Sequence, residues 1–182
     1  MKIFARLAIA AATFTLAAQP VTASAALAVG AQAPDFTTRG ALAGKVLEKV
    51  HLAELLKKGP VVLYFFPAAF TPGCSAEARE FAENIAAFKK AGASVLGMSA
   101  DPVDKLVDFS AKDCANKFAV ASAGPAVITG YDVALPQKAG LTNRTSYVIA
   151  PTGRIVFVHS DLNYVAHVKS TLEFVQGMHK GH

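Results

Sequence analysis

Short apolar runs alternate with amphipathic patterns through the middle of the chain. The run at 61–66, Val-Val-Leu-Tyr-Phe-Phe, has no charged position and is rich in β-branched and aromatic residues, which is typical of a strand covered on both faces. From Ser75 to Gly92, apolar residues recur at helical spacing and predict a long helix that the glycine ends. The apolar positions of this helix are Ala78, Phe81, Ile85 and Phe88. The next apolar run, 93–100, predicts another strand.

The same alternation continues toward the C-terminus. The segment 101–118 predicts a second helix, with Asp101 as its N-cap and Pro102 at the first helical position. After a passage rich in Gly and Pro, the segment 145–159 predicts two strands joined by a tight turn, Pro151-Thr152-Gly153. A last helix is expected over 164–178, and its apolar face consists of Val165, Val168, Leu172 and Val175.

The residues before the first buried strand are less regular. Residues 26–40 are expected to form an extended leader that enters a first strand. Residues 45–59 change from an alternating pattern to a short helical one, which Gly59 ends. The clearer elements follow the order β-α-β-α-β-β-α, so we expect one α/β domain over 26–182 in which helices flank a central mixed β-sheet.

The first 25 residues have the pattern of a secretory signal peptide. Lys2 and Arg6 provide a positive start, an apolar run follows, and Ala-Ser-Ala at 23–25 forms a small-residue cleavage signal. The apolar run is short for a membrane span, and an uncleaved membrane anchor is the alternative. We therefore expect an exported protein, in a bacterial periplasm, with no membrane association once the signal is removed.

Charge and histidine content give little support to other classes of protein. The formal net charge is +5, but part of it belongs to the expected signal peptide, and the pairs Lys57-Lys58 and Lys89-Lys90 fit solvated helix ends. We see no basic patch interleaved with aromatic residues, so we expect no binding to nucleic acid. The histidines are scattered except in the tail, His-Lys-Gly-His at 179–182, and no Cys/His spacing is typical of zinc sites. A non-enzymatic metal carrier is an alternative class, and we expect no metal or other cofactor.

The chain has two cysteines, and Cys74 lies where a buried strand turns into a helix. Free N–H groups and the positive end of the helix dipole at such a place stabilise a thiolate. Gly73 allows close approach of the backbone, and Thr71 carries a hydroxyl one turn earlier. Because exported proteins can also hold structural disulfides, composition alone does not decide between redox chemistry and a structural bridge.

Two sequence blocks resemble the peroxiredoxins. The spacing Pro67-x-x-x-Thr71-x-x-Cys74, within FFPAAFTPGCSAEAREF, resembles the active-site signature of this family, and Thr-Pro-Gly-Cys is most similar to the bacterioferritin-comigratory or Q-type branch. A second block, GLTNRTSYVIAPTGRIVF, resembles the family's later strand pair and places Arg144 at its active-site arginine. Ala150 departs from the pattern, because many relatives carry Asp before this turn.

The resemblance implies a thioredoxin-like fold and a thiol-dependent peroxidase. Such an enzyme reduces hydrogen peroxide and organic hydroperoxides through a sulfenic acid, here on Cys74. Thr71 would hydrogen-bond the thiolate and the peroxide, and Pro67 would shield the sulfur from water. Arg144 would fix sulfur and peroxide, and Glu77 would orient its guanidinium. As an alternative, Glu77 is an ordinary acidic residue in the first turn of a helix.

Cys114 leaves two interpretations open. It lies on the same helical face as Val103, Val107 and Ser110, so it is either a small buried core residue or a resolving cysteine, as some Q-type relatives carry on this helix. The position five residues after the nucleophile holds Arg79, so no resolving cysteine is available there. An external thiol or a thioredoxin-like protein is the expected reductant, and the protein is expected to be a monomer or homodimer.

A thioredoxin-like thiol–disulfide oxidoreductase is the main alternative function. Such exported proteins have Cys-x-x-Cys at the same turn, usually after Trp. In this chain Thr71 occupies the place of the first cysteine, and there is no Trp. The dithiol chemistry is therefore the weaker interpretation.

Overall fold

The computed structural model describes residues 26–180. The expected signal peptide, 1–25, and the last two residues lie outside the described residues. Among the residues described, no helix combines the length and the apolar character that crossing a membrane requires.

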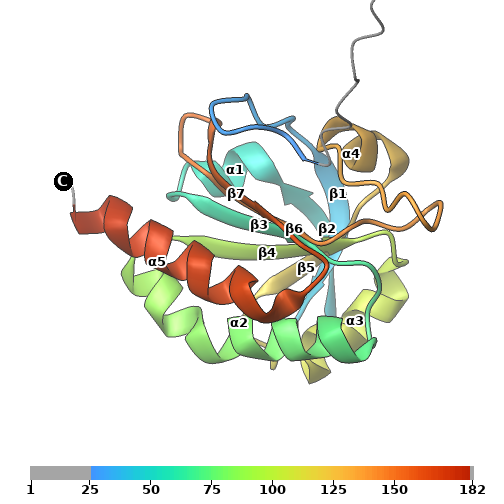
Figure 1. Ribbon diagram of the computed structural model, residues 1–182. Coiled ribbons are helices and arrows are strands. Elements are labelled where there is room, and N and C mark those ends of the chain that lie inside the picture. Colours follow the sequence, from blue (N-terminus) through green and yellow to red (C-terminus); the bar gives the residue numbers. More distant parts are fainter. Residues whose placement is uncertain (1–25, 181–182) are drawn as a thin grey trace, which may run out of the picture.

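A seven-stranded mixed sheet forms the centre of the molecule, with the strand order β2-β1-β5-β4-β3-β6-β7 (Figure 1). The three central strands β5, β4 and β3 are parallel, and the strands on either side pair antiparallel to their neighbours. This confirms the expected α/β fold with a mixed sheet. The strands are β1 (Thr37–Leu42), β2 (Lys45–His51), β3 (Val61–Phe65), β4 (Ser94–Ser99), β5 (Ala119–Ser122), β6 (Thr145–Ile149) and β7 (Ile155–Ser160).

Helices cover both faces of the sheet (Figure 1). On one face lie α2 (Pro72–Lys90), α3 (Val103–Lys112) and α5 (His167–Lys180), the last preceded by the 3₁₀ turn η1 (Tyr164–Ala166). On the other face lie the short helices α1 (Leu52–Leu56) and α4 (Pro125–Gly130). The sheet therefore separates two apolar clusters.

Strand β3 explains why the core has two sides. All five of its residues are fully buried. Because side chains alternate across a strand, Val62 and Tyr64 face the α2 cluster, whereas Leu63 and Phe65 face the α1 cluster. The predicted apolar face of α2 is also buried, at Ala78, Phe81, Ile85 and Phe88. The packing of α2 against β3 fixes the end of β3 and the start of α2, where Cys74 lies.

The structure contains elements that the sequence pattern did not predict. These are β5, which directly precedes the passage rich in Gly and Pro, and α4, which lies within it. The expected first strand and the alternating part of 45–59 are β1 and β2, which pair as a hairpin. β5 has only four residues, too few for a clear period, and it is stabilised by pairing with β4 and β1. A Cβ atom at Gly40 would lie 2.5 Å from the carbonyl oxygen of Val120, so the close β1–β5 approach requires glycine there.

Two details of the predicted helices were wrong. Asp101 is not the N-cap of α3: Pro102 occupies that position without a side-chain cap, and the Asp101 carboxylate accepts from the amide of Ala69, 2.7 Å away. In the last helix, Val165 belongs to η1 and is 60% exposed, whereas Val168 and Val175 are buried as expected. The α-helix begins only at His167, so Val165 lies outside the helical face expected for it, and the helical period alone does not reveal this start.

The end of α3 also differs from the prediction. The helix ends at Lys112, so Cys114 lies in the turn that follows rather than on the helix. Ala115 and Asn116 adopt left-handed backbone conformations, with φ of 48° and 61°. Few residues other than glycine adopt this region, so these two positions end the helix and lead the chain into β5.

Candidate active site

Cys74 lies in the first turn of α2, directly after the loop that follows β3. Pro72 begins the helix, which suits a proline because the first N–H has no helical partner. The Cys74 side chain is only 1% exposed and forms no disulfide. Because the first N–H groups of a helix lack acceptors within it, the thiol lies where negative charge is stabilised.

Arg144 reaches Cys74 from the residue before β6. Its Nη2 lies 3.4 Å from the Cys74 Sγ, its Nη1 pairs with Glu77, and its Nε donates to the carbonyl of Leu162 at 3.0 Å. All three guanidinium nitrogens therefore have an acceptor, and the side chain is buried. The planar fork is held with one edge toward the sulfur, as expected for this residue.

Glu77 is one turn after Cys74 and is fully buried. Burial raises the pKa of Glu77 to about 8, and the nearby Arg144 opposes this rise. The carboxylate pairs with Arg144 through Oε2, while Oε1 has no hydrogen-bond partner. Glu77 is thus not a solvated first-turn acid, because it is fully buried and pairs with the arginine beside the thiol.

Two other predicted residues lie around the thiol. Thr71 is the N-cap residue of α2, but its hydroxyl donates to the carbonyl of Ala68 at 3.0 Å rather than to Cys74. Pro67 is half-buried in the loop between β3 and α2. Because a hydroxyl has one proton, Thr71 must rotate before it can donate to the thiolate or to a peroxide. Its expected role therefore stays a prediction.

The backbone at Gly73 lies close to Arg144 and to the η1 turn. A Cβ atom at this position would lie 3.4 Å from Arg144 Nη2 and 3.6 Å from Tyr164. These are ordinary van der Waals distances, so a small side chain would fit there and the close approach does not require glycine.

His167 is a site residue that the sequence analysis missed. Its Nε2 lies 2.8 Å from the carbonyl oxygen of Asp161, so this nitrogen carries the proton. The other nitrogen, Nδ1, then accepts from the hydroxyl of Ser146 at 2.8 Å and lies 3.8 Å from Glu77 Oε1. Burial lowers the pKa of His167 to about 4, so the ring is neutral. No local pattern separates it from the other scattered histidines, because its partners come from β6, α2 and the β7–η1 loop.

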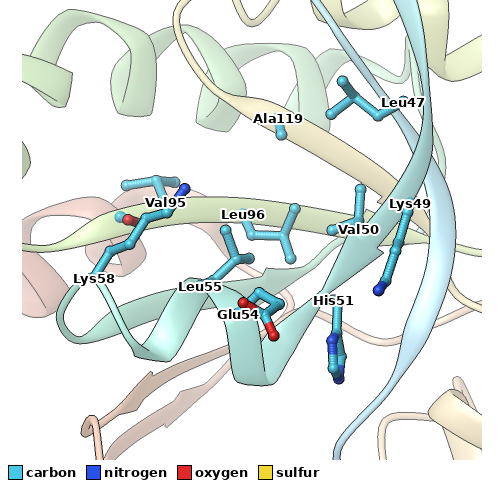
Figure 2. Close-up of a pocket in the computed structure, with 11 residues that line it drawn as sticks. Leu47, Lys49, Val50, His51, Glu54, Leu55, Lys58, Val95, Leu96 and Ala119 are labelled. Carbon is cyan, nitrogen blue, oxygen red and sulfur yellow. The ribbon is translucent and has the colours of Figure 1, made fainter.

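A cavity opens beside Arg144. It is lined on one side by the loop of Leu135 and Pro136 and on the other by Asp161 and Leu162. A second cavity lies elsewhere, between β2, α1 and the starts of β4 and β5 (Figure 2). Its lining includes Lys49, His51 and Lys58 but neither cysteine nor Arg144, so it belongs to no part of the site.

Cys114 is also buried and unbridged. Burial raises the pKa of its thiol, and the neighbouring carboxylate of Asp113 adds to this rise. It belongs to the same apolar cluster as Cys74. Residues 26–180 contain no group of three or more His, Cys, Asp or Glu side chains that could hold a metal ion.

A thioredoxin-like fold with a thiol at the start of a helix, under a buried arginine, defines a class of thiol-based redox enzymes. The AhpC/TSA family model matches residues 29–158, so the chain belongs to this family, which includes the peroxiredoxins. Peroxiredoxin Q, chloroplastic, of Oryza sativa subsp. japonica is 31% identical over 150 residues, covering 82% of this chain and 67% of that protein.

Solved structures agree with this assignment. Peroxidoxin BcpB from Mycobacterium tuberculosis matches with a TM-score of 0.73 and 30% identity, over 82% of this chain and 97% of that one. Peroxiredoxin Q from Xanthomonas campestris matches with a TM-score of 0.66 and 26% identity, over 78% of this chain and 90% of that one. The expected Q-type resemblance is confirmed, and the protein is a thiol-dependent peroxidase by family.

Proposed function

We infer that Cys74 is the nucleophile of this peroxidase and that Arg144 is its principal partner. The single observation that carries this assignment is the guanidinium edge 3.4 Å from the sulfur, with the other nitrogens held by Glu77 and Leu162. A group fixed in this way needs no rearrangement when charge develops beside it, which is the requirement for electrostatic catalysis.

The first step oxidises the sulfur. The Cys74 thiolate attacks one oxygen of the peroxide, the S–O bond forms and the O–O bond breaks. The product is a sulfenic acid, and the leaving hydroxide or alkoxide takes a proton to become water or an alcohol. An ordinary thiol is only a few per cent ionised at pH 7, so complete ionisation raises the rate by only about 30-fold. The larger part of the rate enhancement must come from hydrogen-bond donors to the oxygens of the breaking O–O bond. Arg144 and the first N–H groups of α2 are available for this role.

The second step regenerates the thiol. We propose that Cys114 attacks the sulfenic acid, giving a Cys74–Cys114 disulfide that an external thiol or a thioredoxin-like protein reduces. Such a bond requires Cα atoms within about 7 Å, so the first turn of α2 and the turn after α3 must move. Both segments are at helix ends, where local opening costs little. The alternative of a dithiol oxidoreductase is not favoured by the peroxiredoxin relatives.

Stopped-flow peroxide consumption by the reduced protein, followed by intact mass, tests these assignments. Cys74→Ser is expected to abolish peroxide reduction, because a neutral hydroxyl cannot replace a thiolate. Cys114→Ala is expected to keep the first step within a few-fold of wild type but to accumulate sulfenic acid. An equal loss of the first-step rate in both variants would contradict the roles assigned to Cys74 and Cys114. Export to a bacterial periplasm and a monomeric or homodimeric state are part of the same proposal.

A further inference from the structure

Asp113 connects the two segments that carry the cysteines. The hydroxyl of Ser75 donates to Asp113 Oδ2 at 2.7 Å, and Arg79 Nη2 donates to Asp113 Oδ1 at 2.6 Å. The Asp113 side chain is 5% exposed, whereas that of Arg79 is 64% exposed. We call these three side chains the Asp113 bridge. Since Ser75 follows Cys74 and Asp113 precedes Cys114, this bridge joins the neighbours of both thiols.

The bridge also shows which way Cys74 faces. Successive residues of a helix point about 100° apart. Ser75 points to Asp113 at the end of α3, whereas the Cys74 sulfur points to Arg144 before β6. In the folded state, the hydrogen bond from the start of α2 to the Cys114 segment therefore comes from Ser75, while the Cys74 sulfur is engaged by Arg144. A disulfide requires the Cys74 side chain to leave Arg144 and approach the side that Ser75 now occupies.

We propose that Asp113 is a positioning residue for both steps of the peroxidase cycle. While the Asp113 bridge is closed, it holds the first turn of α2 in place and keeps Cys74 beside Arg144 for reaction with peroxide. The bridge must then open before Cys114 can reach the sulfenic acid. This proposal rests on the resolving role proposed for Cys114.

The rate at which the Asp113 bridge opens affects which product the sulfenic acid forms. The Cys114 sulfur attacks the Cys74 sulfur, the S–S bond forms, the S–O bond breaks, and the sulfenic oxygen leaves as water with the thiol proton. Until this happens, a second peroxide can oxidise the sulfenic acid to sulfinic acid. In the closed state Cys114 is fully buried, and the nearby Asp113 carboxylate disfavours its thiolate. The rate of opening therefore decides the partition between disulfide and overoxidation.

Ser75→Ala in the full chain tests the proposal. It removes one hydrogen bond to a buried carboxylate and leaves Asp113, Arg79 and the helix backbone intact. Because bonds to charged groups are the stronger ones, we expect disulfide formation after one equivalent of peroxide to be about tenfold faster. The first step should stay within about twofold of wild type, and overoxidation at excess peroxide should fall. Arg79→Gln should have a smaller effect, because an exposed ion pair contributes little.

The molecule offers a matched control in Ser99→Ala. Ser99 is buried and donates to Asp101 at 2.8 Å, and Lys105 pairs with the same carboxylate at 2.7 Å. The hydrogen bond removed is of the same kind, and neither partner adjoins a cysteine. Asp101 keeps its bonds to Lys105 and to the amide of Ala69 in this variant, so the loop before α2 stays held. We expect Ser99→Ala to leave disulfide formation and overoxidation unchanged.

A second measurement separates this proposal from the resolving role. In reduced protein without peroxide, alkylation of Cys114, followed by peptide mass, should be about tenfold faster in Ser75→Ala than in wild type or Ser99→Ala. Faster alkylation with no disulfide in any variant would leave the holding role of Asp113 intact and overturn the resolving role of Cys114. Disulfide formation and alkylation that are unchanged or slower in Ser75→Ala would overturn the proposal for Asp113.

Discussion

At the scale of single residues, the site depends on one arginine whose every nitrogen has a defined partner. Arg144 contacts the sulfur, the carboxylate of Glu77 and the carbonyl of Leu162 at once. A buried cation of this kind is stabilised because each of its three side-chain nitrogens has an acceptor. The same contacts remove the rotational freedom of the side chain, so the group that addresses the peroxide is already in position.

Arg144→Lys is expected to remain folded but to lose at least about tenfold in the second-order rate with peroxide. Lysine keeps the charge but cannot address Cys74, Glu77 and Leu162 from one planar group. Stopped-flow kinetics of the reduced protein measures this loss. Arg39→Lys is the control, since Arg39 forms only an exposed pair with Glu48, and it should be unchanged. A rate for Arg144→Lys within twofold of wild type would place the arginine outside the site.

At the scale of elements, the site lies where β3, α2, β6 and α5 meet. β3 and α2 are joined by stacked aromatic rings, Tyr64 on Phe81 with centroids 4.3 Å apart. β4 must leave space for Tyr64, because a Cβ atom at Gly97 would lie 2.8 Å from its ring and hydroxyl. The glycine in β4 therefore permits the packing that positions the start of α2.

Gly97→Ala is expected to lower the free energy of unfolding by about 1–3 kcal/mol, because the fully buried ring cannot move away without strain. Urea denaturation of the reduced protein measures this change. Gly124→Ala is the matched control: an added Cβ atom there meets nothing within 4 Å, and the backbone has φ of −71°. Equal stabilities of the two variants would show that the Tyr64 packing is more adaptable than the distances indicate.

The contact between α5 and β6 is expected to depend on pH through His167. Its pKa falls from 6.5 to about 4 on folding, so the unfolded chain binds more protons between these values. This effect is absent above pH 6.5, destabilises the fold progressively as the pH falls from 6.5 to about 4, and stays constant below that. The destabilisation amounts to about 3 kcal/mol.

His167→Gln retains a donor and an acceptor but does not titrate, so it should lack this contribution. The measurement is the free energy of unfolding of both proteins at pH 4 and pH 7. Carboxyl groups elsewhere in the protein titrate in the same range. Their effect cancels when the free energies of unfolding of the two proteins are subtracted at each pH. Identical pH dependence in both proteins would mean that His167 is not held neutral by the fold.

At the scale of the whole molecule, the described chain begins to pack against the sheet almost at once. The amide of Leu27 donates to the hydroxyl of Tyr147 at 3.0 Å, and Ala26 and Leu27 pack against the α1-side cluster. The expected cleavage after Ala25 therefore removes no residue that these contacts use.

The proposed export predicts a mature chain that begins at Ala26, because small residues at 23 and 25 suit signal peptidase. Intact mass of the protein from a periplasmic fraction measures the new terminus. Ala25→Phe should block cleavage and leave the full-length chain in the membrane fraction. Recovery of uncleaved wild-type protein from membranes would instead support the anchor alternative.

The sequence by itself determined the class of chemistry and the central elements. Cys74, Thr71 and Pro67 lie within one short block, so local spacing was enough to predict a thiol at a strand–helix junction. The strong apolar runs predicted β3 and the buried face of α2, because such long or regular patterns admit few alternatives. The expectation that Arg144 lies beside Cys74 and pairs with Glu77 came only from the family resemblance, and the structure has both contacts.

The tertiary structure decided the remainder, because those contacts join residues far apart in the chain. Spacing cannot show that His167 lies against Ser146 and Asp161, or that Ser75 faces Asp113. Nor could the helical period show that α3 ends before Cys114, since the end depends on where the chain must enter β5. Local patterns report which face of an element is apolar, but the partner of a buried polar group is chosen by the fold that surrounds it.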